Sequence, residues 1–180
     1  DIVIKLDPEI VMKDSWLLRE MSELVYANPL RMYNARCHFT EGNGWYSTFE
    51  EIINSYERHY HYAEGGPFSR SKYYFCSGFN KKNFIEIRGI DELFVTGCGY
   101  DDDNLRTTWR NHFGEYEYEI TAEGIHLWHG PNQSPPSLEH ANRRLFENLK
   151  KQTINNVMRI KNGELVNDEA NWANPKMLSK

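Results

Sequence analysis

The alternation of acidic and hydrophobic residues over positions 115–120 is the feature that most constrains the fold of this chain. The two kinds of residue take turns in the order Glu115, Tyr116, Glu117, Tyr118, Glu119 and Ile120. Because successive side chains of a strand point to opposite faces, this period of two predicts a β-strand with a buried aromatic face and a solvated acidic face. The Ala122-Glu123-Gly124 segment then predicts a turn, so residues 115–128 are expected to form a β-hairpin.

A period of two also marks residues 33–39, where Tyr33 and Cys37 point to one face and Arg36 and His38 point to the other. Three further stretches are bounded by Gly, Asn and Asp, as strands often are. They cover residues 73–77, 84–90 and 93–96. The sequence therefore predicts a sheet of about five or six strands.

Several other segments carry hydrophobic residues at the spacing of an α-helix. The first is expected at residues 8–27, because Asp7-Pro8-Glu9 is a favourable helix start and Asn28-Pro29 is a stop. The remaining predicted helices cover residues 48–60, 104–113 and 138–160.

The predicted order of elements is α-β-α-β-β-β-α-β-β-α, and short connections between consecutive strands favour antiparallel pairing. The fold class is therefore expected to be α+β, with a mainly antiparallel sheet, two long helices and a C-terminal helix packed on it. No repeat or linker divides the chain, so residues 1–166 are predicted to form a single domain. Residues 167–180 are predicted to form a polar tail.

Charge and cysteine content restrict the classes of function. The 180 residues carry a net charge of −5, which argues against a surface built throughout to bind polyphosphate. Three cysteines cannot all pair, and no CxxC motif is present, so we expect a reducing, cytoplasmic environment. No apolar stretch approaches the ~20 residues of a membrane-spanning helix, and no membrane association is predicted.

Side chains that could hold a metal ion or act in catalysis lie apart in the sequence. The adjacent acids Asp101, Asp102 and Asp103 suit the start of a helix as well as a cation site. No HExxH, no GxSxG and no glycine-rich phosphate loop occurs. Local motifs therefore predict no metal and no other cofactor. Catalysis would need a site assembled by the fold, for example from Asp102, Glu119 and His126.

Basic residues on the last predicted helix, together with several aromatic residues, favour binding over catalysis. Four cations recur at a spacing of seven on one helix face, and Tyr and Trp are enriched at the anchors of interfaces. The predicted binding residues are Arg143, Arg144, Lys150, Lys151, Trp45, Tyr46 and Trp172. We therefore predict a non-catalytic binding or assembly protein that contacts a protein partner or another copy of itself, with nucleic acid as a further partner for the last helix. The alternative is a small metal-dependent hydrolase or nuclease whose Asp, Glu and His residues meet only in space.

Overall fold

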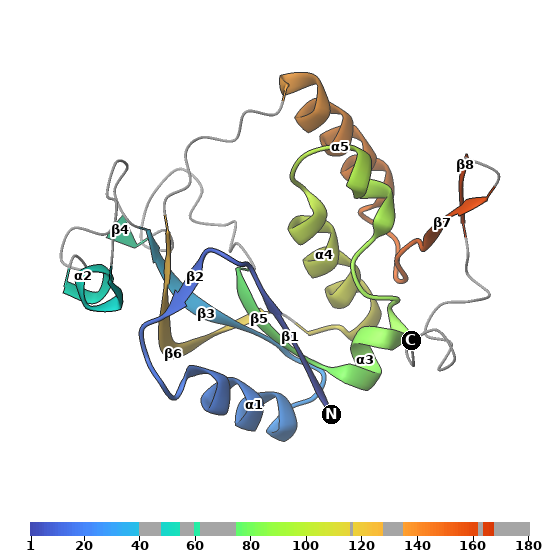
Figure 1. The fold of residues 1–180 in the computed structure, drawn as a ribbon. Helices are drawn as coiled ribbons and strands as arrows, with labels where there is room; N and C mark the ends of the chain where they lie inside the picture. The colour runs from blue at the N-terminus through green and yellow to red at the C-terminus, as the bar shows by residue number, and fades with distance from the viewer. Residues whose placement is uncertain are drawn as a thin grey trace. The chain divides into compact units, whose positions relative to one another are not determined.

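The computed structural model describes residues 1–39, 48–54, 60–61, 75–115, 117–127, 135–161 and 164–167 (Figure 1). The chain divides into two compact units. Unit 1 comprises Asp1–Asn80 and Glu117–Asn132, and unit 2 comprises Lys81–Tyr116 and Gln133–Lys180. In this described part of the chain, no helix combines the length and the apolar character needed to cross a membrane.

Unit 1 is built around a six-stranded sheet in the order β1-β5-β3-β6-β2, with β4 paired to β3. The strands are β1 (Ile2–Leu6), β2 (Ile10–Met12), β3 (Met32–Phe39), β4 (Tyr60–His61), β5 (Cys76–Asn80) and β6 (Glu117–His126). The α+β class is confirmed, but the sheet is mixed and not mainly antiparallel as predicted, because β3 and β6 pair in parallel. Residues 40–116 lie between these two strands, which leaves ample chain for the crossover that a parallel pair requires.

Residues 117–126 form one continuous strand, β6, and not the predicted hairpin. Gly124, which the local pattern places in a turn, pairs with Cys37 on one side and Met12 on the other. A Cβ at Gly124 would lie 3.3 Å from Cγ2 of Ile10. Glycine at this position therefore allows close packing of neighbouring strands and does not reverse the chain.

The predicted burial along β6 is only partly correct. Ile120 is 2% exposed, as expected, whereas Tyr118 is 36% exposed. Tyr118 lies opposite Tyr33 near the beginning of the strand, and the guanidinium of Arg31 lies 4.2 Å from the centre of its ring. This cation–π contact stabilises an aromatic ring that the core does not cover. Tyr116 lies outside the described residues.

The predicted helix over residues 8–27 forms only in its second half. Helix α1 covers Leu17–Ala27, while the chain before it forms β1, a turn and β2. The N–H of Asp7 donates to the carbonyl of Phe75 at 2.8 Å, and the N–H of Ile10 donates to the carbonyl of Asp7 at 3.1 Å. Pairing with β5 and β6 thus overrides the helix-start signal at Asp7-Pro8-Glu9.

Helix α1 packs against strands β1, β3, β5 and β6 (Figure 1). Its buried stripe is formed by Leu17, Met21 and Val25. The core that this stripe completes includes Tyr33, Ala35, Cys37, Cys76, Ile120 and Ala122. The even-numbered residues of β3 face the opposite side of the sheet, as the period of two predicts.

Helix α2 (Phe49–Asn54) confirms the predicted start of the second helix. The hydroxyl of Thr48 accepts the N–H of Glu51, and the carboxylate of Glu51 accepts the N–H of Thr48, each at 3.2 Å. This reciprocal capping box satisfies two N–H groups that a helix start otherwise leaves free. Residues 55–59 of the predicted helix lie outside the described residues.

Unit 2 contains α3 (Lys81–Glu86), the 3-10 helix η2 (Glu92–Thr96), α4 (Asp101–Phe113), α5 (Pro136–Leu149), β7 (Met158–Lys161) and β8 (Glu164–Asn167). The strands predicted at residues 84–90 and 93–96 were wrong, because short apolar runs do not distinguish strands from helical turns. Helix α4 starts two residues before Asp103. Helix α5 ends at Leu149 and does not continue to residue 160. Residues 168–180 of the predicted tail lie outside the described residues.

Candidate functional site

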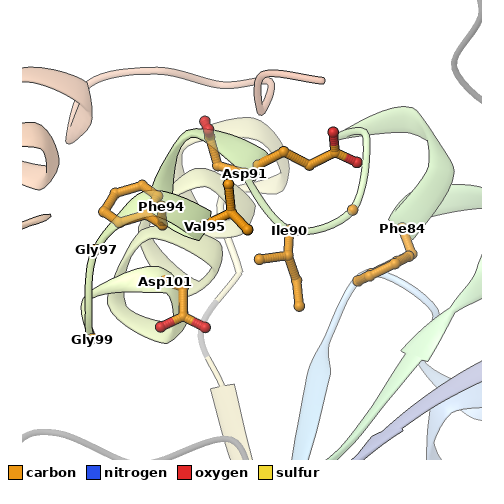
Figure 2. A pocket seen from close by; sticks show the side chains of 10 residues that line it. Phe84, Ile90, Asp91, Phe94, Val95, Gly97, Gly99 and Asp101 are labelled. Carbon is orange, nitrogen blue, oxygen red and sulfur yellow. The ribbon is translucent and has the colours of Figure 1, made fainter. Parts of the chain in front are cut away.

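A cavity of about 500 Å³ in unit 2 is the strongest candidate for a functional site (Figure 2). The segment from Gly89 to Asp101, which includes η2 and reaches the first residue of α4, supplies most of its wall. The apolar part of the lining comes from Phe84, Ile90, Phe94 and Val95. Val95 is 72% exposed, so an apolar surface is open to an incoming molecule.

Strained backbone occurs near both ends of this pocket segment. Arg88 and Gly89 have φ angles of 66° and 68°, and Gly99 and Tyr100 have φ angles of 69° and 67°. A left-handed conformation is costly for residues with bulky side chains such as Arg and Tyr. Strain of this kind persists only where surrounding contacts enforce it, and it is concentrated at functional sites.

Contacts within unit 2 hold Tyr100 in its left-handed conformation. Its ring packs on Phe146 of α5, with ring centres 5.8 Å apart. Its carbonyl accepts the N–H of Asn104 at 2.9 Å, which closes the first turn of α4. Asp101 follows directly, so these contacts fix the backbone from which its side chain projects.

Two of the three adjacent acids, Asp101 and Asp103, occupy different environments. Asp103 forms an ion pair with Arg106 at 3.2 Å; burial raises the pKa of the Asp103 carboxyl, and Arg106 acts in the opposite direction. Asp101 lines the pocket and forms no side-chain hydrogen bond or salt bridge within the described ranges. Figure 2 shows Asp101 among the labelled residues that line the pocket. Asp101 is therefore the acid best placed to meet a ligand.

Asp91 also lines the pocket, but its carboxylate is engaged by the protein. It is 1% exposed. One oxygen accepts the N–H of Leu93 at 3.0 Å, and the other accepts the side-chain amide of Gln152 at 2.9 Å. That second oxygen also accepts the backbone and side-chain N–H groups of Asn156, at 3.0 and 2.8 Å. Four donors compensate the buried charge, so Asp91 holds the fold of the pocket segment.

A second pair of chemically active side chains lies in unit 1. Nε2 of His126 is 3.7 Å from Oε1 of Glu9. His126 is 5% exposed, and its ring lies 4.4 Å from the ring of Phe75, measured between centres. The pairing of Ile10 with His126 between β2 and β6 brings Glu9 to this histidine.

Of the predicted combination of Asp102, Glu119 and His126, the structure places Glu119 and His126 in separate ion pairs. Glu119 lies 3.0 Å from Arg36, whereas His126 pairs with Glu9 and Asp102 belongs to unit 2. Across the ranges that the structure describes, no group of three or more His, Cys, Asp or Glu side chains could hold a metal ion.

A charge network also occupies the face of the sheet opposite α1. The carboxylate of Glu123 lies 2.5 Å from Nζ of Lys13, 3.2 Å from Nε2 of His38 and 3.9 Å from Arg36. The positive and negative groups of this network compensate one another. An ion-pair network of this kind is a common way to cover a polar sheet surface and does not require a ligand.

The predicted binding residues are only partly described. Arg143, Arg144, Lys150 and Lys151 are exposed. The two lysines lie beyond the last residue of α5, and Lys150 pairs with Glu147. The spacing of seven therefore does not correspond to one continuous helix face. The aromatic candidates Trp45, Tyr46 and Trp172 lie outside the described residues.

No known protein family matches this chain, and no curated protein is similar to it. The function is therefore inferred from the chemistry of the described site. Sequence reasoning treated Asp101 as part of a helix start or a cation site and missed the pocket, because its lining comes from α3, η2, the loops around η2 and the first residue of α4. The Gly97-Cys98-Gly99 stretch was the available signal, since closely spaced glycines often mark tight approaches of the backbone.

Proposed function

We propose that the chain is an enzyme that binds an uncharged, polyhydroxylated substrate, such as a carbohydrate, in the pocket of unit 2. The observation that carries this proposal is the composition of the pocket. Apolar side chains alternate with the acids Asp101 and Glu92, and Lys, Arg and His are absent from the described residues that line it. This combination disfavours anionic ligands and favours ligands that donate hydrogen bonds.

Ionised carboxylates accept hydrogen bonds and cannot donate them. A ligand for this pocket must therefore supply donors, and hydroxyl groups do so without carrying charge. The C–H faces of a sugar ring would pack against Ile90, Phe94 and Val95, as apolar walls with a few polar groups commonly bind small molecules. A phosphate or carboxylate ligand would be repelled by the acidic lining.

Asp101 is the proposed general base. Its carboxylate lines the pocket at the first residue of α4, and a carboxylate that accepts a hydrogen bond from a substrate hydroxyl is placed to accept the proton of that hydroxyl. The rigid turn formed by Gly99 and Tyr100 would hold this carboxylate in place before the substrate arrives, as catalysis by orientation requires.

Ligand titration tests this function. The methyl β-glycosides of glucose, galactose and N-acetylglucosamine would be added separately while the backbone amide signals of Gly97 and Gly99 are followed by NMR. We expect saturable shifts with at least one glycoside and none with inorganic phosphate. Asp101→Ala should weaken binding about tenfold or more, because it removes a charged acceptor. The matched control Glu139→Ala, in the exposed first turn of α5, should bind like the wild type. Equal affinity in Asp101→Ala, or no saturable shift with any of the three glycosides, would exclude the proposal.

The pair formed by Glu9 and His126 favours a second candidate, binding of a divalent cation together with a phosphate. A carboxylate oxygen and an imidazole nitrogen 3.7 Å apart can both ligate one ion after small side-chain movements, and both are ligands for Mn²⁺ and Zn²⁺. With two protein ligands, the remaining positions would be filled by water and by substrate phosphate oxygens, as is usual for Mg²⁺-type sites.

Paramagnetic broadening by Mn²⁺ tests the second candidate. Signals from residues around His126 should broaden at substoichiometric Mn²⁺ in the wild type and not in Glu9→Gln, while the exposed control Glu23→Gln on α1 should behave like the wild type. Broadening that survives Glu9→Gln would place the ion elsewhere. The predicted binding of a macromolecular partner through the basic residues around α5 stays a separate prediction.

A further inference from the structure

One buried amide connects helix α5 to the pocket segment. Asn142 is 3% exposed. Its Nδ2 donates to the carbonyl of Phe94 at 3.1 Å and to the carbonyl of Gly99 at 2.8 Å. Phe94 and Gly99 both line the pocket, so a single side chain fixes two points of the pocket wall that lie on either side of Gly97 (Figure 2).

Gly97 is required by the position of Asn142. A Cβ added at Gly97 would lie 1.9 Å from Oδ1 of Asn142, and the three nearest atoms all belong to that one side chain. The backbone of Gly97 is extended, with φ of −121°, which any residue can adopt. The glycine therefore provides room for the Asn142 amide and is not needed for its backbone freedom.

The same face of α5 also contacts the end of the pocket segment nearest to Asp101. Phe146 lies four residues after Asn142, so the two side chains project from one side of the helix. The ring of Phe146 packs against Tyr100, the residue before Asp101. The opposite end of the segment is held at Asp91 by Gln152 and Asn156, which follow α5 in the chain.

We propose that Asn142 is a positioning residue of the pocket, which sets the carbonyls of Phe94 and Gly99 and, through the Gly99-Tyr100 turn, the place of the Asp101 carboxylate. The identity of the ligand rests on the proposed function. The positioning role of Asn142 rests only on its hydrogen bonds to Phe94 and Gly99. Without the amide donors, the segment 97–100 is expected to open locally while the rest of unit 2 stays folded.

Cys98 reports on this opening without any ligand. It lies between Gly97 and Gly99 and is half-buried, whereas Cys37 and Cys76 are buried. In Asn142→Asp the side chain keeps its shape but loses both N–H donors. We expect iodoacetamide to alkylate Cys98 about tenfold faster in this variant, because each lost hydrogen bond multiplies the open population several-fold. The control Asn148→Asp, exposed on the same helix, should leave the rate within about twofold of the wild type.

A double-mutant cycle tests the contact with Gly97. Gly97→Ala should lower the melting temperature by several degrees in the wild type and much less in Asn142→Ala, because the second variant removes the atoms with which the new Cβ collides. Asn142→Ala introduces no charge, so it also replaces Asn142→Asp in the alkylation measurement if the latter does not fold. A merely space-filling Asn142 would still couple to Gly97 in this cycle but would leave the Cys98 alkylation rate unchanged, and an unchanged rate would overturn the proposal.

Ligand affinity supplies the third measurement. Asn142→Asp should weaken the binding of the methyl glycosides by a factor similar to that of Asp101→Ala, whereas Asn148→Asp should not. If no glycoside binds the wild type, the proposed function fails, but the alkylation rate and the mutant cycle still decide the role of Asn142. If a glycoside binds equally well to the wild type and to Asn142→Asp, the positioning role is wrong and the proposed function stands.

Discussion

The carboxylate of Glu20 on α1 binds the backbone of Thr121 and Ala122 on β6. It accepts the N–H of Thr121 at 3.3 Å and the N–H of Ala122 at 2.9 Å. It also accepts the hydroxyl of Thr121 at 2.7 Å. The pairing of β3 with β6 is irregular at this point, where its register shifts between Asn34 and Arg36. Glu20 therefore satisfies N–H groups that the irregular pairing leaves without a partner strand.

Removal of the Glu20 carboxylate should destabilise unit 1. We expect Glu20→Ala to lower the free energy of unfolding by about 1–3 kcal/mol, because N–H groups lose a charged acceptor. Urea denaturation at neutral pH measures this change. The control is Glu23→Ala, which replaces an exposed acid on the same helix; it should change the free energy by less than about half a kcal/mol. Equal effects of the two substitutions would mean that the bulge does not depend on Glu20.

The sequence was sufficient for elements whose burial follows a local period. Strand β3 was predicted at residues 33–39 because Tyr33 and Cys37 alternate with polar residues, and the structure confirms it. The turn predicted at Gly124 was wrong, because a glycine that makes room for a neighbouring strand has the same local signature as a glycine in a turn. Only the identity of the partner strands distinguishes the two cases.

The candidate site was also hard to predict because it depends on residues that lie far apart in the sequence. The acids at residues 101–103 are visible in the sequence, but the amide that fixes the pocket beside them belongs to Asn142, 43 residues beyond Gly99. An isolated Asn on an exposed helix has no periodic pattern that marks it as buried. The hydrogen bonds to Phe94 and Gly99 arise from tertiary packing, and no local propensity encodes them.

Stability should fall at alkaline pH because of two buried thiols. Burial raises the pKa of Cys37 to about 12 and that of Cys76 to about 11, from an ordinary value of 9.0. Both pKa values are higher in the folded than in the unfolded chain, so the thiols favour folding below pH 9, and this contribution is lost as pH rises through 9 towards 11 and 12. Unfolding free energies measured in urea between pH 7 and 10.5 should therefore fall less steeply for Cys37→Ala than for the wild type. Parallel curves would show that Cys37 is accessible to solvent.

The basic residues around α5 are expected to act on an acidic partner and not on folding. Arg143, Arg144, Lys150 and Lys151 are exposed, so replacing all four with Gln should leave the melting temperature within about 2 °C of the wild type. A labelled 20-nucleotide single-stranded DNA serves as an acidic probe at two salt concentrations. If the basic residues contact phosphates, the four-Gln variant should bind more weakly and its affinity should depend less on salt. Equal affinities and equal salt dependence in the wild type and the four-Gln variant would show that these basic residues do not bind the acidic probe.

Substitution of Asp91 should mainly lower stability, whereas substitution of Asp101 should mainly weaken ligand binding. Asp91 is buried and accepts four N–H groups, so Asp91→Ala leaves several buried donors without an acceptor. We expect it to lower the free energy of unfolding by about 2–5 kcal/mol. Asp101 is half-buried at the first position of α4, and Asp101→Ala should cost at most about 1 kcal/mol, mainly through its interaction with the helix dipole.

Ligand affinity should follow the opposite order when Asp101→Ala is compared with the milder variant Asp91→Asn, each in its folded state. Glycoside affinity should fall about tenfold in Asp101→Ala, because the ligand loses a charged acceptor. Asp91→Asn keeps an oxygen acceptor for Leu93 and should bind within a few-fold of the wild type at temperatures where it remains folded. Urea denaturation and glycoside titration on the same samples measure both quantities. If Asp91→Asn lost binding while remaining folded and Asp101→Ala did not, the ligand would contact Asp91, and the assignment of the general base would have to move to that residue.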